Sequence, residues 1–139
     1  MFDNNPALTR SARFPADETA PTRALLLVQE FVAASVCGPH LEAKLCIIVE
    51  ELVVNVIEHG APEAGSEIAV VLSNEAGGIG VTIADRGQYF DPRSAEISEI
   101  VPERGGGAGL ALIRAWSAIR DYTRVDGANR LDLLLPADV

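Results

Sequence analysis

The sequence predicts a two-layer α/β (α+β) sandwich, in which helices cover one face of a mixed, mostly antiparallel sheet. Apolar residues recur at helical spacing in two early segments, at about 19–35 and 41–59. Strand-like runs follow at 68–73 and 79–84, and a second pair flanks the Asp-Gly at 126–127, which is a strong hairpin signal. Strands joined by short turns pair antiparallel, so we expect one sheet with the helices packed on it.

The N-terminal part begins with a tail and an edge strand. Residues 1–8 are predicted to be a flexible tail, and residues 9–139 to form one domain, since the chain has the usual length of a single domain. Residues 9–14 predict an edge strand that ends at a proline. The first helix is then expected to begin at a capping Asp17 or Thr19.

The rest of the chain alternates between periodic segments and one long loop. The second helix should stop at Gly60, because glycine commonly terminates helices. Residues 86–106 are rich in glycine, proline and charge, and a loop of this length in a small domain is often a functional lid. A third helix is predicted at 107–119, followed by strands at 122–125 and 130–135.

Composition and charge exclude several classes of protein. With 48% hydrophobic and 22% charged residues, the chain is expected to fold rather than to be disordered. Its net charge of −9 repels phosphate backbones, so we expect no direct nucleic-acid binding. No apolar run reaches the roughly 20 residues needed to span a bilayer, and the start of the chain lacks a secretory signal's apolar core. We therefore expect a cytoplasmic location without membrane association.

A polar stripe runs along the second helix. Glu51, Asn55 and His59 are spaced four residues apart and lie on one face, with Glu58 beside them. The helix is otherwise largely apolar and should be buried, so the carboxylate and the amide need partners. The asparagine oxygen could bind Mg²⁺, and the carboxylate could accept a proton from a water or hydroxyl. The alternative is a surface helix whose polar side chains face solvent.

A second motif ends the strand at 79–84. Asp85 shares one face of that strand with Val81 and Ile83, so it points where the buried side chains point. A carboxylate there can accept a hydrogen bond from an exocyclic amino group such as that of adenine. Gly87 would let a flat ring approach. The alternative is an ordinary Asp-x-Gly turn.

A third motif precedes the last predicted helix. Gly105, Gly106, Gly107 and Gly109 lie where the chain enters that helix, and Arg104 stands next to them. A glycine-rich helix N-terminus attracts phosphate through free N–H groups and the helix dipole. Arg104 could reach a terminal phosphate. The alternative is a flexible linker, because the spacing matches neither a P-loop nor a dinucleotide fingerprint.

Together the three motifs resemble those of a known superfamily. The order E-x-x-x-N, D-x-G and G-x-G-L is similar to that of the GHKL ATPases, which have the Bergerat ATP-binding fold. The segments DRGQYFDP and ERGGGAGLALI, and the closing DYTRVDGANRLDLLLP, resemble most the small serine/threonine kinases that act as anti-sigma factors. The resemblance extends from about residue 9 to residue 136.

The resemblance implies ATP and Mg²⁺ as ligands and assigns a role to each motif. Glu51 matches the general base and Asn55 the magnesium ligand. Asp85 matches the adenine-binding carboxylate, and Gly87 matches the glycine that makes room for the ring. In the third motif, Gly107, Gly109 and Leu110 match the family's phosphate-binding residues, with Gly105 and Gly106 before them. Arg104 matches the arginine of the family's lid, which approaches the terminal phosphate.

Some residues depart from the family's pattern. Gln88 and Tyr89 stand where the family often has smaller side chains, which would alter the edge of the pocket. The lid is short and carries Glu96, Glu99 and Glu103, which would weaken its closure on phosphate.

The function that the resemblance implies is a protein serine/threonine kinase. Its substrate would be a STAS-type anti-sigma-factor antagonist, its second partner a sigma factor, and its own state a homodimer. The alternatives are a non-catalytic ATP-binding module that sequesters a partner, and the ATPase part of a larger phosphorelay protein. An intact Glu51 favours the kinase over the non-catalytic module.

Overall fold

A five-stranded sheet with three helices forms the part of the chain that the computed structural model describes, which is residues 8–35, 37–88, 93 and 106–137. The elements are β1 (Thr9–Pro15), α1 (Ala20–Ala34), α2 (Pro39–His59), β2 (Glu67–Glu75), β3 (Gly78–Asp85), α3 (Gly106–Trp116), β4 (Ala118–Val125) and β5 (Ala128–Pro136). The strand order is β1-β2-β3-β5-β4, and each of these pairings is antiparallel. The predicted sandwich is confirmed, with an antiparallel sheet where the sequence had allowed a mixed one.

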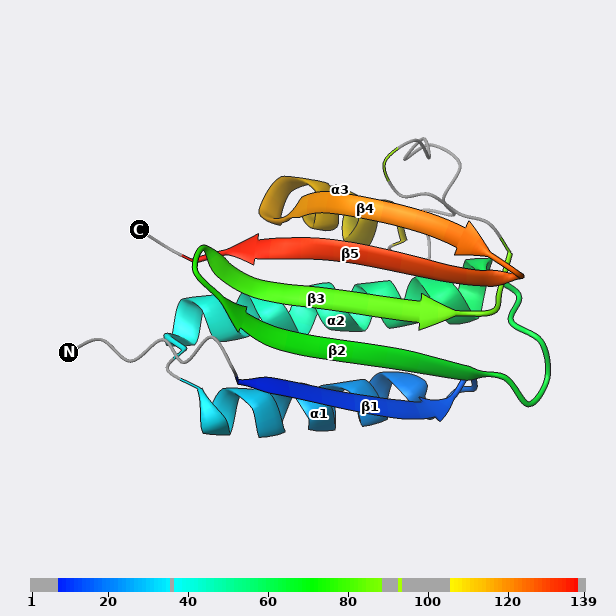
Figure 1. Cartoon of the computed structure of the whole chain (residues 1–139), viewed down its shortest axis with the longest axis horizontal. Helices are drawn as coiled ribbons and strands as arrows, with labels where there is room; N and C mark the ends of the chain where they lie inside the picture. The colour runs from blue at the N-terminus through cyan, green and yellow to red at the C-terminus, as the bar shows by residue number, and fades with distance from the viewer. Residues whose placement is uncertain (1–7, 36, 89–92, 94–105, 138–139) are drawn as a thin grey trace.

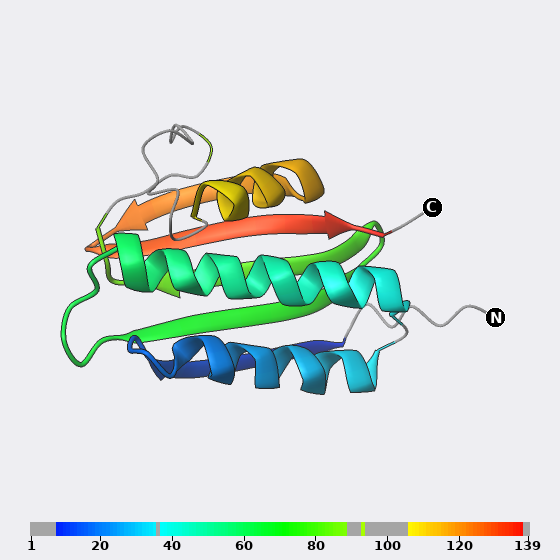
Figure 2. The same cartoon turned by 180° about the vertical axis from the view of Figure 1, so that it is seen from behind.

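All three helices lie on the same face of the sheet. Figure 1 views the sheet from its helix-free side, and Figure 2 shows α1, α2 and α3 in front of the strands. Helix α2 packs between α1 and α3 and crosses behind β3. This central place brings the polar stripe of α2 next to the end of β3 and the beginning of α3.

The apolar core lies between the helices and the sheet. Alternate residues of β2 and β5 are buried, as expected for strands with one covered face. Phe31, Leu45 and Ile48 from the helices are fully buried, as are Ile68 and Leu133 from the strands. Burial of side chains of this size contributes roughly 1.5–3 kcal/mol each. The core therefore holds α2 firmly against the sheet.

The N-terminal elements begin close to their predicted positions. Leu8, predicted as part of the tail, belongs to the folded part, since its carbonyl accepts a hydrogen bond from the Asn74 N–H at 3.0 Å. Residues 1–7 lie outside the described residues. Thr19 is the residue before α1, but its side chain makes no capping bond. Instead Asp17 Oδ1 accepts hydrogen bonds from Thr19 N at 2.8 Å and Thr19 Oγ1 at 2.6 Å.

The C-terminal boundary of α3 differs from the prediction. The helix ends at Trp116 rather than at residue 119, and β4 begins at Ala118. Ala118 pairs with Leu134 on β5, so the backbone from Ala118 on joins the sheet instead of continuing the helix. Apolar periodicity did not separate these states, because Ile119 packs against the core from a strand as well as it would from a helix. The predicted hairpin is confirmed, with positive φ at Asp126 and Gly127.

Candidate functional site

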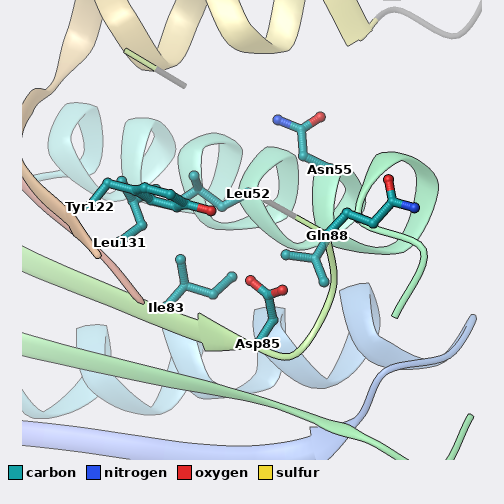
Figure 3. A pocket seen from close by; sticks show the side chains of 9 residues that line it. Leu52, Asn55, Ile83, Asp85, Gln88, Tyr122 and Leu131 are labelled. Atoms are coloured by element: carbon teal, nitrogen blue, oxygen red, sulfur yellow. The ribbon is translucent and has the colours of Figure 1, made fainter. Parts of the chain in front are cut away.

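A pocket opens between α2 and the ends of β3, β4 and β5. It holds about 450 Å³ of space not filled by protein atoms, part of which is open solvent. Figure 3 shows side chains of these elements around it. The lining residues are Leu52, Asn55, Val56, Gly60, Ile83, Asp85, Gln88, Tyr122 and Leu131. Apolar walls with a few polar groups are typical of a small-molecule site.

Asp85, the last residue of β3, contributes a carboxylate to this pocket. Its Oδ1 accepts hydrogen bonds from the Gly87 N–H at 2.7 Å and from Asn129 Nδ2 at 3.0 Å. Both bonds go to the same oxygen, so the carboxylate is fixed while its second oxygen keeps acceptor capacity. The predicted position of Asp85, on the face of β3 that carries buried side chains, is therefore confirmed.

Gly87 has a steric reason that the sequence did not show. A Cβ at this position would lie 2.5 Å from the carbonyl oxygen of Gly60 and 3.1 Å from Asp85 Oδ1. The neighbouring Gln88 N–H donates to the same Gly60 carbonyl at 2.5 Å. The turn after β3 thus packs on the end of α2, and only glycine fits that approach. Contact with the chain itself therefore already requires glycine here, and room for a ring stays a prediction.

Two residues outside the three motifs hold Asp85 and the turn that follows it. Asn129, on β5, is 2% exposed, and its amide group donates to Asp85 Oδ1 and to the Gly87 carbonyl, each at 3.0 Å. Arg124, on β4, donates to the Gly87 carbonyl at 2.8 Å and to Asn129 Oδ1 at 2.7 Å. A polar residue in the apolar alternation of β5 was the sequence signal that could have pointed to Asn129.

Asn55 lies on α2, close to the end of the helix at His59, and is 8% exposed. Its Oδ1 is buried and has no hydrogen-bond partner among the described residues. An unpartnered buried acceptor costs on the order of 1–3 kcal/mol, so such an atom is typically retained for a ligand. Carbonyl oxygens are ligands that Mg²⁺ accepts, and this oxygen therefore fits the predicted metal. No group of three His, Cys, Asp or Glu side chains suited to a metal occurs in the described ranges, so further ligands would come from phosphates and water.

Glu51 lies one turn before Asn55, on the same face of α2. Partial burial raises the pKa of its carboxyl above the ordinary value, and the charges of Glu50 and Glu58 raise it further. Its carboxylate lies against the α-carbon of Gly109 on α3, where an added Cβ would overlap Glu51 Oε2. The structure therefore brings together Glu51, Asn55 and the beginning of α3. Helical spacing predicted the first two on one face, and their roles toward a ligand stay predictions.

The part of the chain that the structure describes includes only some of the other predicted site residues. Gly106 and Gly107 open α3, and Leu110 is fully buried within the same helix. Arg104 and Gly105 lie outside the described residues, as do Tyr89 and most of the expected lid with Glu96, Glu99 and Glu103. Gln88 is described, and it lines the pocket as its position suggested.

Comparison with known proteins agrees with this geometry. The family of histidine kinase-like ATPase domains matches residues 14–135, which is most of the chain. The chain belongs to this family. No curated protein matches the chain. As a histidine kinase-like ATPase domain it is a member of the GHKL superfamily, and the family implies ATP binding.

Among solved structures, the chain is similar to the crystal structure of the RsbU and RsbW domains of Rv1364c from Mycobacterium tuberculosis. The TM-score is 0.65 with 19% sequence identity, over 95% of this chain and 33% of that one. This domain thus spans about a third of the length of that structure's chain, and the likeness supports the fold. No helix within the described ranges is long and apolar enough to cross a membrane.

Proposed function

We propose that this histidine kinase-like domain is an ATP-dependent protein serine/threonine kinase that acts as an anti-sigma factor. The observation that carries the proposal is the pair formed by Glu51 and Asn55 on one face of α2. Glu51 has a carboxyl with a raised pKa, and Asn55 has a buried oxygen without a described partner. A stronger base beside an oxygen that can coordinate Mg²⁺ suits transfer of a phosphoryl group to a hydroxyl.

The nucleotide would lie between the end of β3 and the beginning of α3. Asp85 would accept a hydrogen bond from the amino group of adenine with its second oxygen, since the chain already holds the first, Oδ1. The first turn of α3, which contains Gly106, Gly107 and Gly109, would bind the phosphates through backbone N–H groups. Asn55 would hold Mg²⁺, which neutralises charge on the phosphates during transfer.

Glu51 would orient a serine or threonine hydroxyl of the protein substrate for attack on the γ-phosphorus. The new bond joins the hydroxyl oxygen to phosphorus, and the bond from phosphorus to the β–γ bridging oxygen breaks. The hydroxyl proton goes to the Glu51 carboxylate, and ADP leaves with the electron pair of the broken bond. The raised pKa makes Glu51 a better proton acceptor than an ordinary glutamate. Arg104 would stabilise the terminal phosphate from the lid.

The partners follow from the sequence resemblance. They would be a STAS-type anti-sigma-factor antagonist, which accepts the phosphoryl group, and a sigma factor, which a homodimer of the chain holds inactive in the cytoplasm. The similar structure carries the name RsbU and RsbW domains, which supports the resemblance at the level of the fold. A partner surface would also exclude water from the γ-phosphate and so limit wasteful hydrolysis.

Phosphorylation of a candidate partner tests this proposal. The purified chain is incubated with Mg²⁺, labelled ATP and each STAS protein of the same genome, and label on serine or threonine is measured. We expect slow ATP hydrolysis by the chain alone and faster, Glu51-dependent labelling of one partner. Tight binding of a STAS protein that is never labelled would favour the sequestering module instead. Rapid hydrolysis without any partner would contradict both functions and indicate a plain ATPase.

A further inference from the structure

Asp85, Asn129 and Arg124 form a row across three neighbouring strands. Asn129 on β5 is the register partner of Asp85 on β3 and also of Arg124 on β4. Side chains of directly paired residues lie on the same face of a sheet, so a hydrogen-bonded chain can run from one to the next. The chain runs from Arg124 through Asn129 to Asp85.

The amide of Asn129 has one orientation in this row. Its nitrogen faces three acceptors: Asp85 Oδ1 and the carbonyls of Gly87 and Gln88, at 3.0, 3.0 and 3.2 Å. Its oxygen faces Arg124, which donates at 2.7 Å. A guanidinium has donors only, so it can face only the oxygen of the amide. The three acceptors and Arg124 together fix which end of Asn129 meets the Asp85 carboxylate, and Arg124 alone holds the oxygen end among the described contacts.

We propose that Arg124, acting through Asn129, is a positioning residue that sets the base specificity of the nucleotide site. The inference rests on the proposed binding of ATP. Asn129 and the Gly87 N–H occupy one oxygen of Asp85 and leave the other as an acceptor toward the base. Adenine carries an amino donor where guanine carries a carbonyl acceptor. A carboxylate held in this way accepts from adenine and repels guanine.

Removal of Arg124 would loosen this arrangement from a distance. Asn129 is buried, so its oxygen would lose the Arg124 bond in a place with little water to replace it. The amide would then be held at its nitrogen end alone, so the side chain could shift and loosen its hydrogen bond to the Asp85 carboxylate. A carboxylate with a looser partner would hold its second oxygen less firmly in the position in which it discriminates between adenine and guanine.

The experiment compares the dissociation constants of MgATP and MgGTP by calorimetry in three proteins: the wild type, Arg124→Met and Arg130→Met. Arg130 is the matched control, because it is exposed on β5 next to Asn129 and its removal changes the net charge equally. We expect the wild type to prefer ATP at least about tenfold, the worth of one hydrogen bond to a charged group. Arg124→Met should reduce this preference to less than about threefold, mainly because MgATP binds more weakly. Arg130→Met should retain it.

An unchanged preference in Arg124→Met would overturn the inference, provided that the wild type binds ATP. A wild type that binds neither nucleotide would instead contradict the proposed function, and the inference would fall with it. Arg124→Lys keeps a charged donor and should give a preference between those of the wild type and Arg124→Met. A lysine variant no more selective than the methionine variant would contradict the hydrogen-bond mechanism.

The Asp85→Ala background separates positioning from a general structural role. If Arg124 acts through the carboxylate, adding Arg124→Met to Asp85→Ala should change ATP affinity less than about twofold, because nothing remains to be positioned. The same loss of affinity with and without Asp85 would show that Arg124 merely supports the fold, and would overturn the inference.

Discussion

The two ends of the pocket differ in how far the chain satisfies its own polar groups. At the end of β3, Asp85 is held by Gly87 and Asn129, and Asn129 is held in turn by Arg124. On α2, Asn55 has a buried oxygen without a partner among the described residues, and Glu51 has a carboxyl whose pKa burial raises. Among the described residues, hydrogen bonds within the chain hold the polar groups at the end of β3, whereas the buried Asn55 oxygen on α2 has none.

This difference indicates how the two ends would divide their work. Hydrogen bonds made within the chain fix the Asp85 carboxylate, which we propose as the acceptor for adenine, so little ordering would remain for the nucleotide to impose. An unsatisfied buried oxygen destabilises the fold, and a ligand that satisfies it regains that free energy on binding. We therefore expect the end at β3, with Asp85, to determine which nucleotide binds. The end at α2, with Glu51 and Asn55, should determine the dependence on Mg²⁺ and the rate of phosphoryl transfer.

The largest effect should come from Glu51→Ala. It should lower phosphotransfer to the STAS partner by roughly 100-fold or more, the usual contribution of a positioned base. ATP affinity should change little, because the Glu51 carboxylate would contact the substrate hydroxyl and not the nucleotide. Single-turnover transfer of label and calorimetric titration of ATP measure the two quantities on the same preparation. Equal transfer rates in variant and wild type would remove Glu51 from the mechanism.

Asp85→Ala should affect the opposite quantity. We expect ATP to bind more weakly by about 1–3 kcal/mol, which is the cost of losing a hydrogen bond to a charged group. The transfer rate at saturating ATP should fall much less than in the Glu51 variant. A variant that loses rate but keeps affinity would show that the two ends are not separated in this way.

Gly109→Ala tests the contact between α3 and Glu51. Alanine is about 1 kcal/mol more favourable than glycine inside a helix, so thermal stability should stay the same or rise. The new methyl group would displace the Glu51 carboxylate, and we expect transfer to slow by about tenfold, as for a misplaced base. An aspartate at position 51 is one methylene shorter and leaves room for the new methyl group. Glu51→Asp should therefore slow transfer less in the Gly109→Ala variant than in the wild type.

Gly38→Ala is the control for Gly109→Ala, because an added Cβ at Gly38 meets no described atom within 4 Å apart from its neighbours along the chain. Its transfer rate should equal that of the wild type. If Gly109→Ala loses ATP affinity as much as rate, the glycine serves phosphate binding rather than the position of Glu51.

The smallest effect concerns stability and pH. The folded state raises the pKa of Glu51 above its ordinary value of 4.5, so the folded chain binds more protons than the unfolded chain between those two values. Stability from this group therefore falls as the pH rises through that window. Glu51→Gln should be more stable than the wild type at neutral pH, by less than about 1 kcal/mol because the carboxyl is partly exposed.

The advantage of Glu51→Gln should disappear below about pH 4, where the wild-type carboxyl is protonated in both states. Thermal unfolding at several pH values measures it, with Glu67→Gln, an exposed carboxyl on β2, as the control for loss of one charge. A difference that is the same at every pH would contradict burial of the Glu51 charge.

The sequence predicted the elements well and the site in part. Helical spacing placed Glu51 and Asn55 on one face of α2, and strand alternation placed Asp85 beside the buried residues of β3. Both patterns are local, so they can be read from short segments. Arg124 and Asn129 were missed because their role depends on strand order, which brings β5 between β3 and β4. The steric role of Gly109 likewise depends on where α3 packs on α2.

Calorimetric titration of ATP with and without Mg²⁺, in the wild type and in Asn55→Ala, tests the central claim most directly. The wild type should bind ATP more tightly with Mg²⁺ than without it, because the metal would satisfy the buried Asn55 oxygen. Asn55→Ala should bind ATP with little dependence on Mg²⁺, since the end at β3 remains intact. Absence of wild-type binding at millimolar ATP, or the same dependence on Mg²⁺ in both proteins, would contradict the account.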